Sequence, residues 1–228
     1  MIIGGIQKLT LIDYPGKLAC TVFLAGCNFR CPWCYSSELV LPEKIKEQPK
    51  TSEKELFDFL EGKKDLIEGV VICGGEPTLQ NDLEDLVKKI KKMDFLVKLD
   101  TNGSNSKILA DLVDKKLIDY VAMDIKLPRE RYSELTENVS EIEESVDFLK
   151  KNKVDYEFRT TMVPGVLNKE DILNIANWLK GSEKYYLQNF RAEKTLDPKF
   201  ENIKPYSDNY LIRIQKEISS NFKICEIR

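Results

Sequence analysis

The feature that most constrains the fold is a regular alternation of short, β-rich apolar runs with amphipathic helical stretches along nearly the whole chain. Such strand–helix repetition with short connections favours parallel strand pairing and right-handed crossovers. Seven runs are expected to form strands: 18–24, 69–73, 95–100, 120–125, 156–162, 185–190 and 222–227. The six strand–helix units are too few to close an eight-stranded barrel. The pattern therefore predicts an α/β fold in the form of a partial, open (β/α)6 barrel of the TIM type.

Helix starts are marked by capping signals, in which a Ser or Asn is followed three residues later by Glu. These signals predict helices that begin after Ser52, Asn81 and Ser140, and Asn168 opens a further helix. In that last helix the apolar residues share one face, as in a helix laid against a sheet: Ile172, Ile175, Ala176 and Leu179.

The length of 228 residues fits a single domain over 1–228, and no Pro/Ser-rich linker or repeat divides it. We expect a short N-terminal extension over about 1–17 and a helix–strand appendage over about 205–228.

The composition excludes several classes of partner. The chain has 35 Lys and Arg residues against 38 Asp and Glu residues, a net charge of −3, which leaves no basic footprint for nucleic acid or for an anionic membrane. No apolar run approaches the roughly 20 residues that a membrane span needs, and the start of the chain lacks the pattern of a signal peptide. We therefore expect a cytoplasmic protein.

The chain contains no histidine. This absence excludes Ser-His-Asp and Cys-His catalysis, His-ligated zinc or haem, and acid–base chemistry by imidazole. The chemistry must therefore come from carboxylates, lysines, cysteines or a cofactor.

Three of the six cysteines, Cys27, Cys31 and Cys34, lie together where the first predicted strand ends. Their spacing suits an iron–sulfur cluster with one open iron, a zinc site completed by another ligand, or unrelated redox or surface thiols. The remaining three cysteines are expected to be buried small hydrophobes: Cys20, Cys73 and Cys225. An extracellular disulfide framework would spread its cysteines, so the thiols are expected to stay reduced.

Polar and glycine-rich segments follow the ends of the other predicted strands. They are Gly74-Gly75-Glu76-Pro77, Asp100-Thr101-Asn102-Gly103, Asp124-Ile125-Lys126, and a strand carrying Arg159 that leads into Val163-Pro164-Gly165. In parallel α/β barrels chemistry collects at the carboxyl ends of the strands. We therefore expect these segments to face the three cysteines around one opening at the carboxyl ends of the strands, which we call the mouth.

The Cys-x3-Cys-x2-Cys loop, with Trp33 directly before its last cysteine, resembles the signature of radical S-adenosylmethionine (SAM) enzymes. Gly74-Gly75-Glu76-Pro77 is similar to the second motif of that superfamily. Residues 5–17, 185–191 and 194–198 resemble the anaerobic ribonucleoside-triphosphate reductase activating proteins. The segments that begin at Asp100, Asp124 and Val163 are similar to parts of the pyruvate formate-lyase activating enzymes.

The resemblance implies a [4Fe-4S] cluster held by Cys27, Cys31 and Cys34, whose free iron chelates SAM. Reductive cleavage of SAM would give a 5′-deoxyadenosyl radical, which abstracts hydrogen from a glycine of a partner such as anaerobic ribonucleotide reductase. A low-potential donor such as flavodoxin or ferredoxin would supply the electron.

The resemblance also implies roles for residues that contact SAM. Backbone groups of Gly74 and Gly75 would accept from its amino group, with Glu76 supporting that segment, and Asp100 and Asn102 would lie near its ribose or amino-acid end.

Further roles follow from the same resemblance. Lys126 would pair with the methionine carboxylate, and Trp33 would pack on the adenine side. Arg159, a charge inside an apolar strand, would face the cofactor or substrate, since a buried charge needs a partner. Asp100 and Asp124 would help to bind a monovalent cation.

Two positions depart from the relatives. Tyr35-Ser36 stand where relatives commonly have His-Asn, and Gln188 or Asn189 stands where formate-lyase activating enzymes have a histidine. Both departures concern the substrate end. Two alternatives therefore stay open: a radical SAM enzyme acting on a small molecule or another peptide, and a non-catalytic zinc or iron–sulfur binding module.

Overall fold

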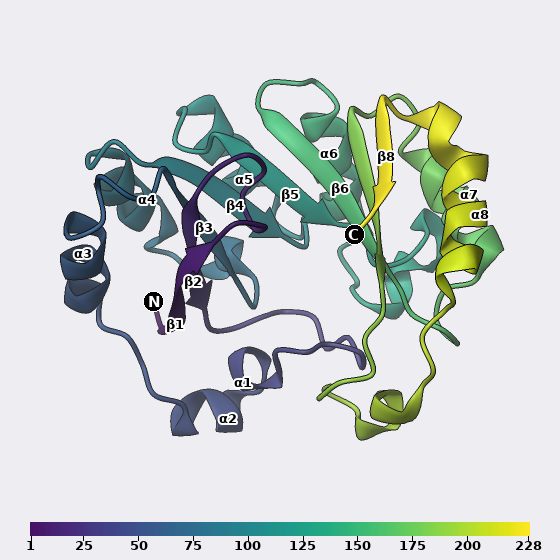
Figure 1. Cartoon of the computed structure of the whole chain (residues 1–228), viewed down its shortest axis with the longest axis horizontal. Helices are drawn as coiled ribbons and strands as arrows, with labels where there is room; N and C mark the ends of the chain where they lie inside the picture. Colours follow the sequence, from purple (N-terminus) through teal and green to yellow (C-terminus); the bar gives the residue numbers. More distant parts are fainter.

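The computed structural model describes residues 1–228, whose eight strands form one sheet in chain order from β1 to β8 (Figure 1). The strands are β1 (Ile3–Thr10), β2 (Ala19–Leu24), β3 (Gly69–Gly74), β4 (Leu96–Thr101), β5 (Tyr120–Asp124), β6 (Asp155–Met162), β7 (Lys184–Asn189) and β8 (Ile224–Ile227). Strands β2 to β8 pair in parallel, and β1 pairs antiparallel with β2. All seven strands expected from the sequence are present, with ends displaced by at most two residues.

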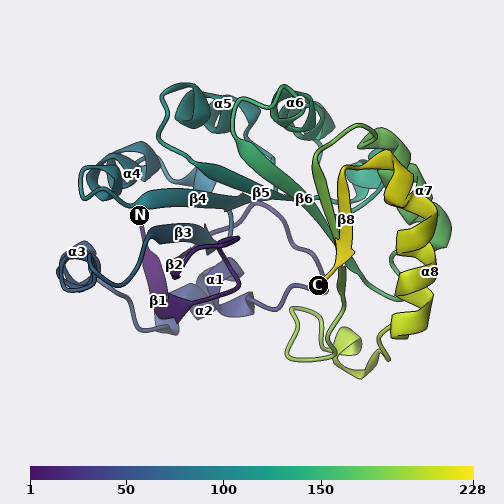
Figure 2. The same ribbon diagram turned by 45° about the horizontal axis from the view of Figure 1, so that its top comes forward.

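The sheet curves strongly but does not close, because β1 and β8 remain its two edges (Figure 2). The prediction of an open barrel is therefore confirmed. Six helices cover the outer face of the sheet: α3 (Glu53–Glu61), α4 (Leu83–Lys91), α5 (Ser106–Asp114), α6 (Val139–Leu149), α7 (Lys169–Trp178) and α8 (Asp208–Ile218). The two short helices α1 (Ser37–Val40) and α2 (Pro42–Glu47) lie beside β1 and β2 instead. None of these helices combines the length and the apolar composition that a membrane crossing needs.

The first strand, β1, was not expected from the sequence, which placed an extension there. Ile6 of β1 pairs with Val22 of β2, so this segment is an edge of the sheet. Gly4 and Gly5 hide the strand pattern because glycine has low β propensity. A side chain at Gly4 would meet the Cδ2 atom of Leu39 at 2.4 Å, so the glycine lets α1 pack against this edge.

Two of the predicted helix starts are confirmed. Ser52 and Glu55 form the capping box that begins α3. Asn168 begins α7 and forms a capping box with Asp171. In both cases two backbone N–H groups that the helix leaves free are satisfied by side chains.

The other two predicted starts are wrong by one or two residues. Asp82, not Asn81, precedes α4, and its carboxylate binds the amino group of Met1 at 3.0 Å instead of capping the helix. Helix α6 begins after Asn138, so that Ser140 already lies inside the first turn. An ion pair between residues 81 positions apart in sequence thus takes the place of the local cap of α4.

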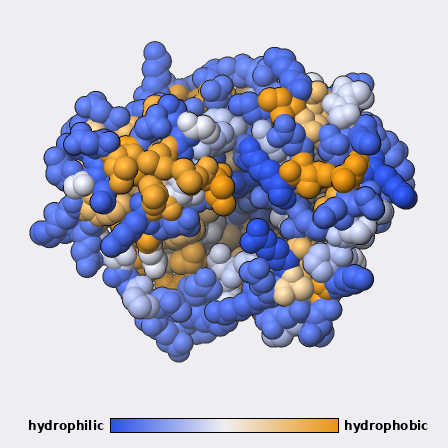
Figure 3. Space-filling model, viewed as in Figure 1, coloured by the Kyte–Doolittle hydropathy of each residue, from blue (hydrophilic) through white to orange (hydrophobic).

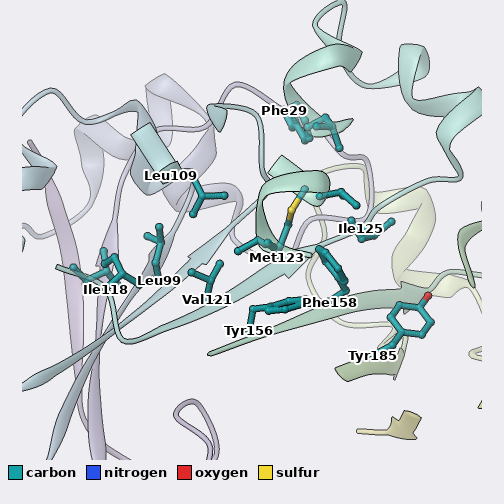
Figure 4. Close-up of a cluster of buried hydrophobic side chains, with 14 of the residues drawn as sticks. Phe29, Leu99, Leu109, Ile118, Val121, Met123, Ile125, Tyr156, Phe158 and Tyr185 are labelled. Atoms are coloured by element: carbon teal, nitrogen blue, oxygen red, sulfur yellow. The ribbon is translucent and has the colours of Figure 1, made fainter. Parts of the chain in front are cut away.

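The hydrophobic core lies between the outer face of the sheet and the helices. Figure 4 shows Leu99, Val121 and Phe158 from three neighbouring strands on this side, with Leu109 of α5 close by. All four side chains are fully buried. Because side chains alternate along a strand, the residues between them face the inside of the barrel, which we call the lumen.

We predict that Ile175→Ala on α7 lowers the free energy of unfolding by about 2–5 kcal/mol, because it leaves a cavity against the sheet. Ile175 is fully buried, whereas Ile12 is 82% exposed and provides a matched control. The Ile12→Ala variant is expected to stay within about 0.5 kcal/mol of wild type in urea denaturation. Equal losses of unfolding free energy in the two variants would contradict the placement of Ile175 in the core.

Candidate functional site

The three clustered cysteines lie on the loop that leaves the carboxyl end of β2. Cys31 is buried, whereas Cys27 and Cys34 are half-buried. The loop is ordered by its own hydrogen bonds: the Cys34 N–H donates to the Cys31 carbonyl at 3.0 Å, and the Phe29 N–H donates to the Cys27 Sγ at 3.4 Å. The loop therefore has a defined shape that presents two partly accessible thiols.

The segment that follows β7 is hydrogen-bonded to this cysteine loop and packs against it. The backbone N–H of Leu196 donates to the Cys34 carbonyl, and that of Asp197 donates to the Pro32 carbonyl, both at 2.9 Å. Trp33 is buried, and its ring centre lies 6.3 Å from that of Phe200 in the same segment. Residues 194–200 thus secure the loop from the far end of the barrel, although they are more than 150 positions away in sequence.

The donor set fits an iron–sulfur cluster. Burial raises the pKa of the Cys27 thiol, and burial raises that of Cys31 to about 11, with the other two loop thiols adding to the rise and Lys126 opposing it. No three Cys, Asp or Glu side chains meet closely enough to hold one metal ion. A cubane cluster does not require this, because it offers a separate iron to each thiolate. Binding would replace the thiol protons and relieve the cost of burying thiolates.

The two glycines that follow β3 are required by the close approach of β2. Gly74 has φ +123°, and a Cβ atom there would lie 2.2 Å from the Leu24 carbonyl oxygen. A Cβ atom on Gly75 would lie 2.0 Å from the carbonyl oxygen of Gly26. The Glu76 N–H also donates to that carbonyl at 2.7 Å. These residues therefore seat the β3 loop directly against the start of the cysteine loop.

Glu76 is buried and accepts hydrogen bonds from two loops. Its Oε1 accepts from the N–H and hydroxyl of Thr78, at 3.1 and 2.6 Å, and from the Thr101 hydroxyl at 2.7 Å. Its Oε2 accepts from the Asn102 N–H at 2.6 Å. Burial raises the pKa of Glu76, and these hydrogen bonds oppose that rise. Its carboxylate thus joins the loop after β3 to the loop after β4.

Asn102 continues the connection to the cysteine loop. Its Nδ2 donates to the Asn28 side-chain oxygen at 3.0 Å and lies 4.0 Å from the Cys27 Sγ. Its Oδ1 accepts from the Ser104 N–H at 2.9 Å. Asn102 therefore forms a local turn and also contacts a thiol of the cysteine loop.

A network of charges lines the lumen beside this mouth. Arg159 on β6 donates from Nη1 to Asp100 Oδ2 at 3.0 Å and from Nε to Asp124 Oδ1 at 2.9 Å. Lys98 pairs with the other oxygen of Asp100, and Lys126 lies 3.5 Å from the other oxygen of Asp124. We refer to these five residues as the lumen network. It brings together four of the residues that the sequence singled out.

The pKa values in the lumen network follow from this pairing. Burial disfavours the charge of Asp124, but Arg159 and Lys126 more than offset it and lower the pKa of the carboxyl group. Burial likewise acts to lower the pKa of Lys126, yet Asp124 and the nearby Cys31 raise it. Both groups therefore stay charged at neutral pH, which keeps a positive side chain next to the cysteine loop.

The two departures from the relatives lie at the end of β7. The Tyr35 ring stacks on Phe190, with ring centres 5.9 Å apart, and its hydroxyl oxygen accepts from the Arg191 N–H at 2.7 Å. The Asn189 side chain donates to the Tyr206 carbonyl at 2.9 Å. Tyr35 thus helps to join the cysteine loop to β7, a contact between segments 156 residues apart.

Sequence reasoning missed Lys98, which is only 1% exposed and carries one end of the lumen network. The signal was available, because Lys98 and Asp100 lie two residues apart on one strand and therefore share a face. Of the cysteines expected in the core, Cys20 and Cys225 are buried, but Cys73 is only half-buried. Burial raises the Cys73 pKa to about 12, and the nearby Asp100 adds to the rise.

Comparison with known proteins agrees with this geometry. The family model described as the radical SAM superfamily matches residues 21–179. A protein of Methanocaldococcus jannaschii, provisionally named a glycyl-radical enzyme activating enzyme, is 37% identical over 94% of this chain and 90% of its own length. A second protein of that organism, with the same kind of name, is 29% identical over 93% of this chain and 85% of its own length.

Among solved structures, Streptococcus suis SuiB bound to S-adenosylmethionine has a similar fold. The TM-score is 0.66 at 15% identity, over 90% of this chain. This chain spans 51% of the length of SuiB. The likeness extends the agreement to the three-dimensional arrangement of the strands.

We predict that Glu76→Gln lowers the free energy of unfolding by about 1–3 kcal/mol, because an amide cannot accept from every buried donor that faces this carboxylate. The same variant is expected to bind S-adenosylmethionine more weakly in equilibrium dialysis, since the β3 and β4 loops lose their connection. Glu61→Gln, at an exposed position on α3, is the control and should change neither quantity. Wild-type stability in the Glu76 variant would rule out the supporting role.

A second prediction concerns the approach of the β3 loop to the cysteine loop. Gly75→Ala is expected to reduce the iron bound per chain after anaerobic reconstitution, because its methyl group would displace the Gly26 carbonyl. Gly5→Ala is the matched control, since no atom lies within 4 Å of a Cβ atom there. If both variants load iron like the wild type, the close approach is not needed for the site.

Proposed function

This chain belongs to the radical SAM superfamily, and we propose that it generates a glycyl radical on a partner enzyme, with anaerobic ribonucleoside-triphosphate reductase as the first candidate. One observation carries the proposal: the 37% identity, over nearly the whole of both chains, with the relative named a glycyl-radical enzyme activating enzyme. The segments 5–17, 185–191 and 194–198, which resemble the reductase activating proteins, support this choice of partner.

Enzymes of this superfamily use a [4Fe-4S] cluster and S-adenosylmethionine, whose one-electron cleavage supplies the radical. In the proposal, Cys27, Cys31 and Cys34 hold the cluster at the carboxyl end of β2. Zinc in this loop stays a lesser alternative, because zinc requires four ligands around a single ion. Flavodoxin or ferredoxin is the proposed electron donor, and the cytoplasm, where thiols stay reduced, is the proposed location.

The chain's own residues would bind and orient the small cofactor. The backbone of Gly74 and Gly75, held close to β2 and to the start of the cysteine loop, would accept from the amino group of the cofactor. Lys126 and Arg159 present positive charge that would attract a carboxylate. Trp33 packs against Phe200, which keeps the ring beside the mouth on its proposed adenine side.

The open barrel supports a macromolecular substrate. Because β1 and β8 are not joined, the lumen can be approached from the side as well as from the mouth. In the view of Figure 1, the surface of the molecule has a central recess with hydrophobic surface on both sides (Figure 3). Leu11 and Ile12, in the connection between β1 and β2, are 75% and 82% exposed. A glycine-bearing loop of a partner would fit such an entrance better than it would a closed barrel.

The experiment is an anaerobic reaction of the reconstituted, reduced protein with S-adenosylmethionine and anaerobic ribonucleotide reductase. We expect about four irons per chain, release of 5′-deoxyadenosine, and a glycine-centred EPR signal on the partner. Cys31→Ser should abolish all three, whereas Cys225→Ser, at a buried thiol on β8 far from the cysteine loop in sequence, should retain them.

Other outcomes would favour the alternatives. Release of 5′-deoxyadenosine with consumption of a small molecule and no protein radical would favour a small-molecule enzyme. Stoichiometric zinc without iron would favour a binding module. Cluster loading without cleavage of S-adenosylmethionine would count against radical chemistry altogether.

A further inference from the structure

We infer that Arg159 is a built-in cation of the lumen network, so that the carboxylates of Asp100 and Asp124 need no monovalent metal ion. The resemblance to pyruvate formate-lyase activating enzymes implied such an ion between these two residues. The side chains present here do not fit one. The inference rests on the charges of the lumen and not on which partner the enzyme acts upon.

The geometry places one guanidinium group between the two carboxylates. Asp124 on β5 is the register partner of Arg159 on β6, and Asp100 lies on the neighbouring strand β4. The guanidinium donates to Asp100 at 3.0 Å and to Asp124 at 2.9 Å through two different nitrogens. A metal ion that bridged the same two oxygens would have to occupy the position of this group.

The remaining carboxylate oxygens are also paired. Lys98 binds Oδ1 of Asp100, and Lys126 lies 3.5 Å from Oδ2 of Asp124. All four oxygens therefore face a protein cation, and three positive side chains already exceed two negative ones. A metal ion would add a fourth positive charge to this set, which like-charge repulsion opposes.

The buried guanidinium group of Arg159 differs from a bound metal ion in that it is part of the chain and does not exchange with the solution. Arg159 is 14% exposed and Asp100 is 11% exposed, so an unpaired Asp100 carboxylate would be costly. A metal ion exchanges with the solution and depends on the salt present. Arginine is attached to β6 and keeps its charge at every physiological pH. The charge balance of the lumen is therefore independent of the ions in the cell.

The test compares wild type and variants in potassium, sodium or tetramethylammonium chloride at equal ionic strength. Tetramethylammonium is too large to replace a metal ion between two carboxylates. The first measurement is the melting temperature of the chain, which needs no radical chemistry, and the second is 5′-deoxyadenosine release. A failure of the proposed partner reaction would therefore leave the melting result intact.

For the wild type we expect melting temperatures that agree within about 1 °C in the three salts, because no site is left for the ion to stabilise. Arg159→Gln removes the charge and leaves two facing carboxylates. Its melting temperature should be lower in tetramethylammonium and should rise by roughly 2–4 °C, with saturation, as potassium or sodium is added.

Two controls separate this effect from a general loss of stability. Arg131 also joins two carboxylates, Glu134 and Asp171, but its side chain is 32% exposed and lies outside the lumen network. Arg131→Gln should show no preference for a metal ion, because Glu134 is 52% exposed and the buried Asp171 carboxylate still accepts from the Asn168 N–H. Arg159→Lys keeps the charge and should remain insensitive to the salt.

A saturable rise of the wild-type melting temperature or activity with potassium or sodium would overturn the inference. So would an Arg159→Gln variant that folds but gains nothing from either ion. If that variant does not fold, the wild type and Arg159→Lys decide the question, since both are expected to be indifferent to the metal ion.

Discussion

The mouth of this barrel depends on the buried carboxylate of Glu76. Its side chain accepts from Thr101 and Asn102 after β4, and its own N–H donates to Gly26 before the first cysteine. Asn102 then reaches Asn28 and the Cys27 thiol. Three loops from neighbouring strands are thus held by one side chain and its immediate partners. Because a buried carboxylate is stable only when hydrogen-bonded, the same bonds that satisfy Glu76 also order the cysteine loop.

The second support of the site comes from the far end of the sheet. An open barrel gains access for a large partner, but it loses the strand pairing that would hold the two sides of the mouth together. The bonds from Leu196 and Asp197 to the cysteine loop, and the contact of Tyr35 with Phe190, replace part of that pairing. Residues 194–198, which resemble the reductase activating proteins, therefore contact the cysteine loop.

The lumen carries charged side chains, whereas the core on the other face of the sheet is apolar. Alternation along β4 to β6 places Leu99 and Phe158 against helices, and Asp100 and Arg159 toward the lumen. The buried charges are tolerated because each is paired with one or two others. Their surplus of positive charge lies next to the cysteine loop, where Lys126 opposes the rise of the Cys31 pKa.

Periodicity by itself predicted the parallel strands and the open barrel, and the spacing of Cys27, Cys31 and Cys34 by itself marked the candidate ligand loop. These properties reside in short stretches of sequence, since strand periodicity and ligand spacing are local. Tertiary structure alone decided that β1 forms an edge, that Asp82 binds the N-terminus rather than capping α4, and that Arg159 pairs with both Asp100 and Asp124. Each of these depends on a contact between residues far apart along the chain. Where a side chain has several possible partners, only the folded structure decides which of them it contacts.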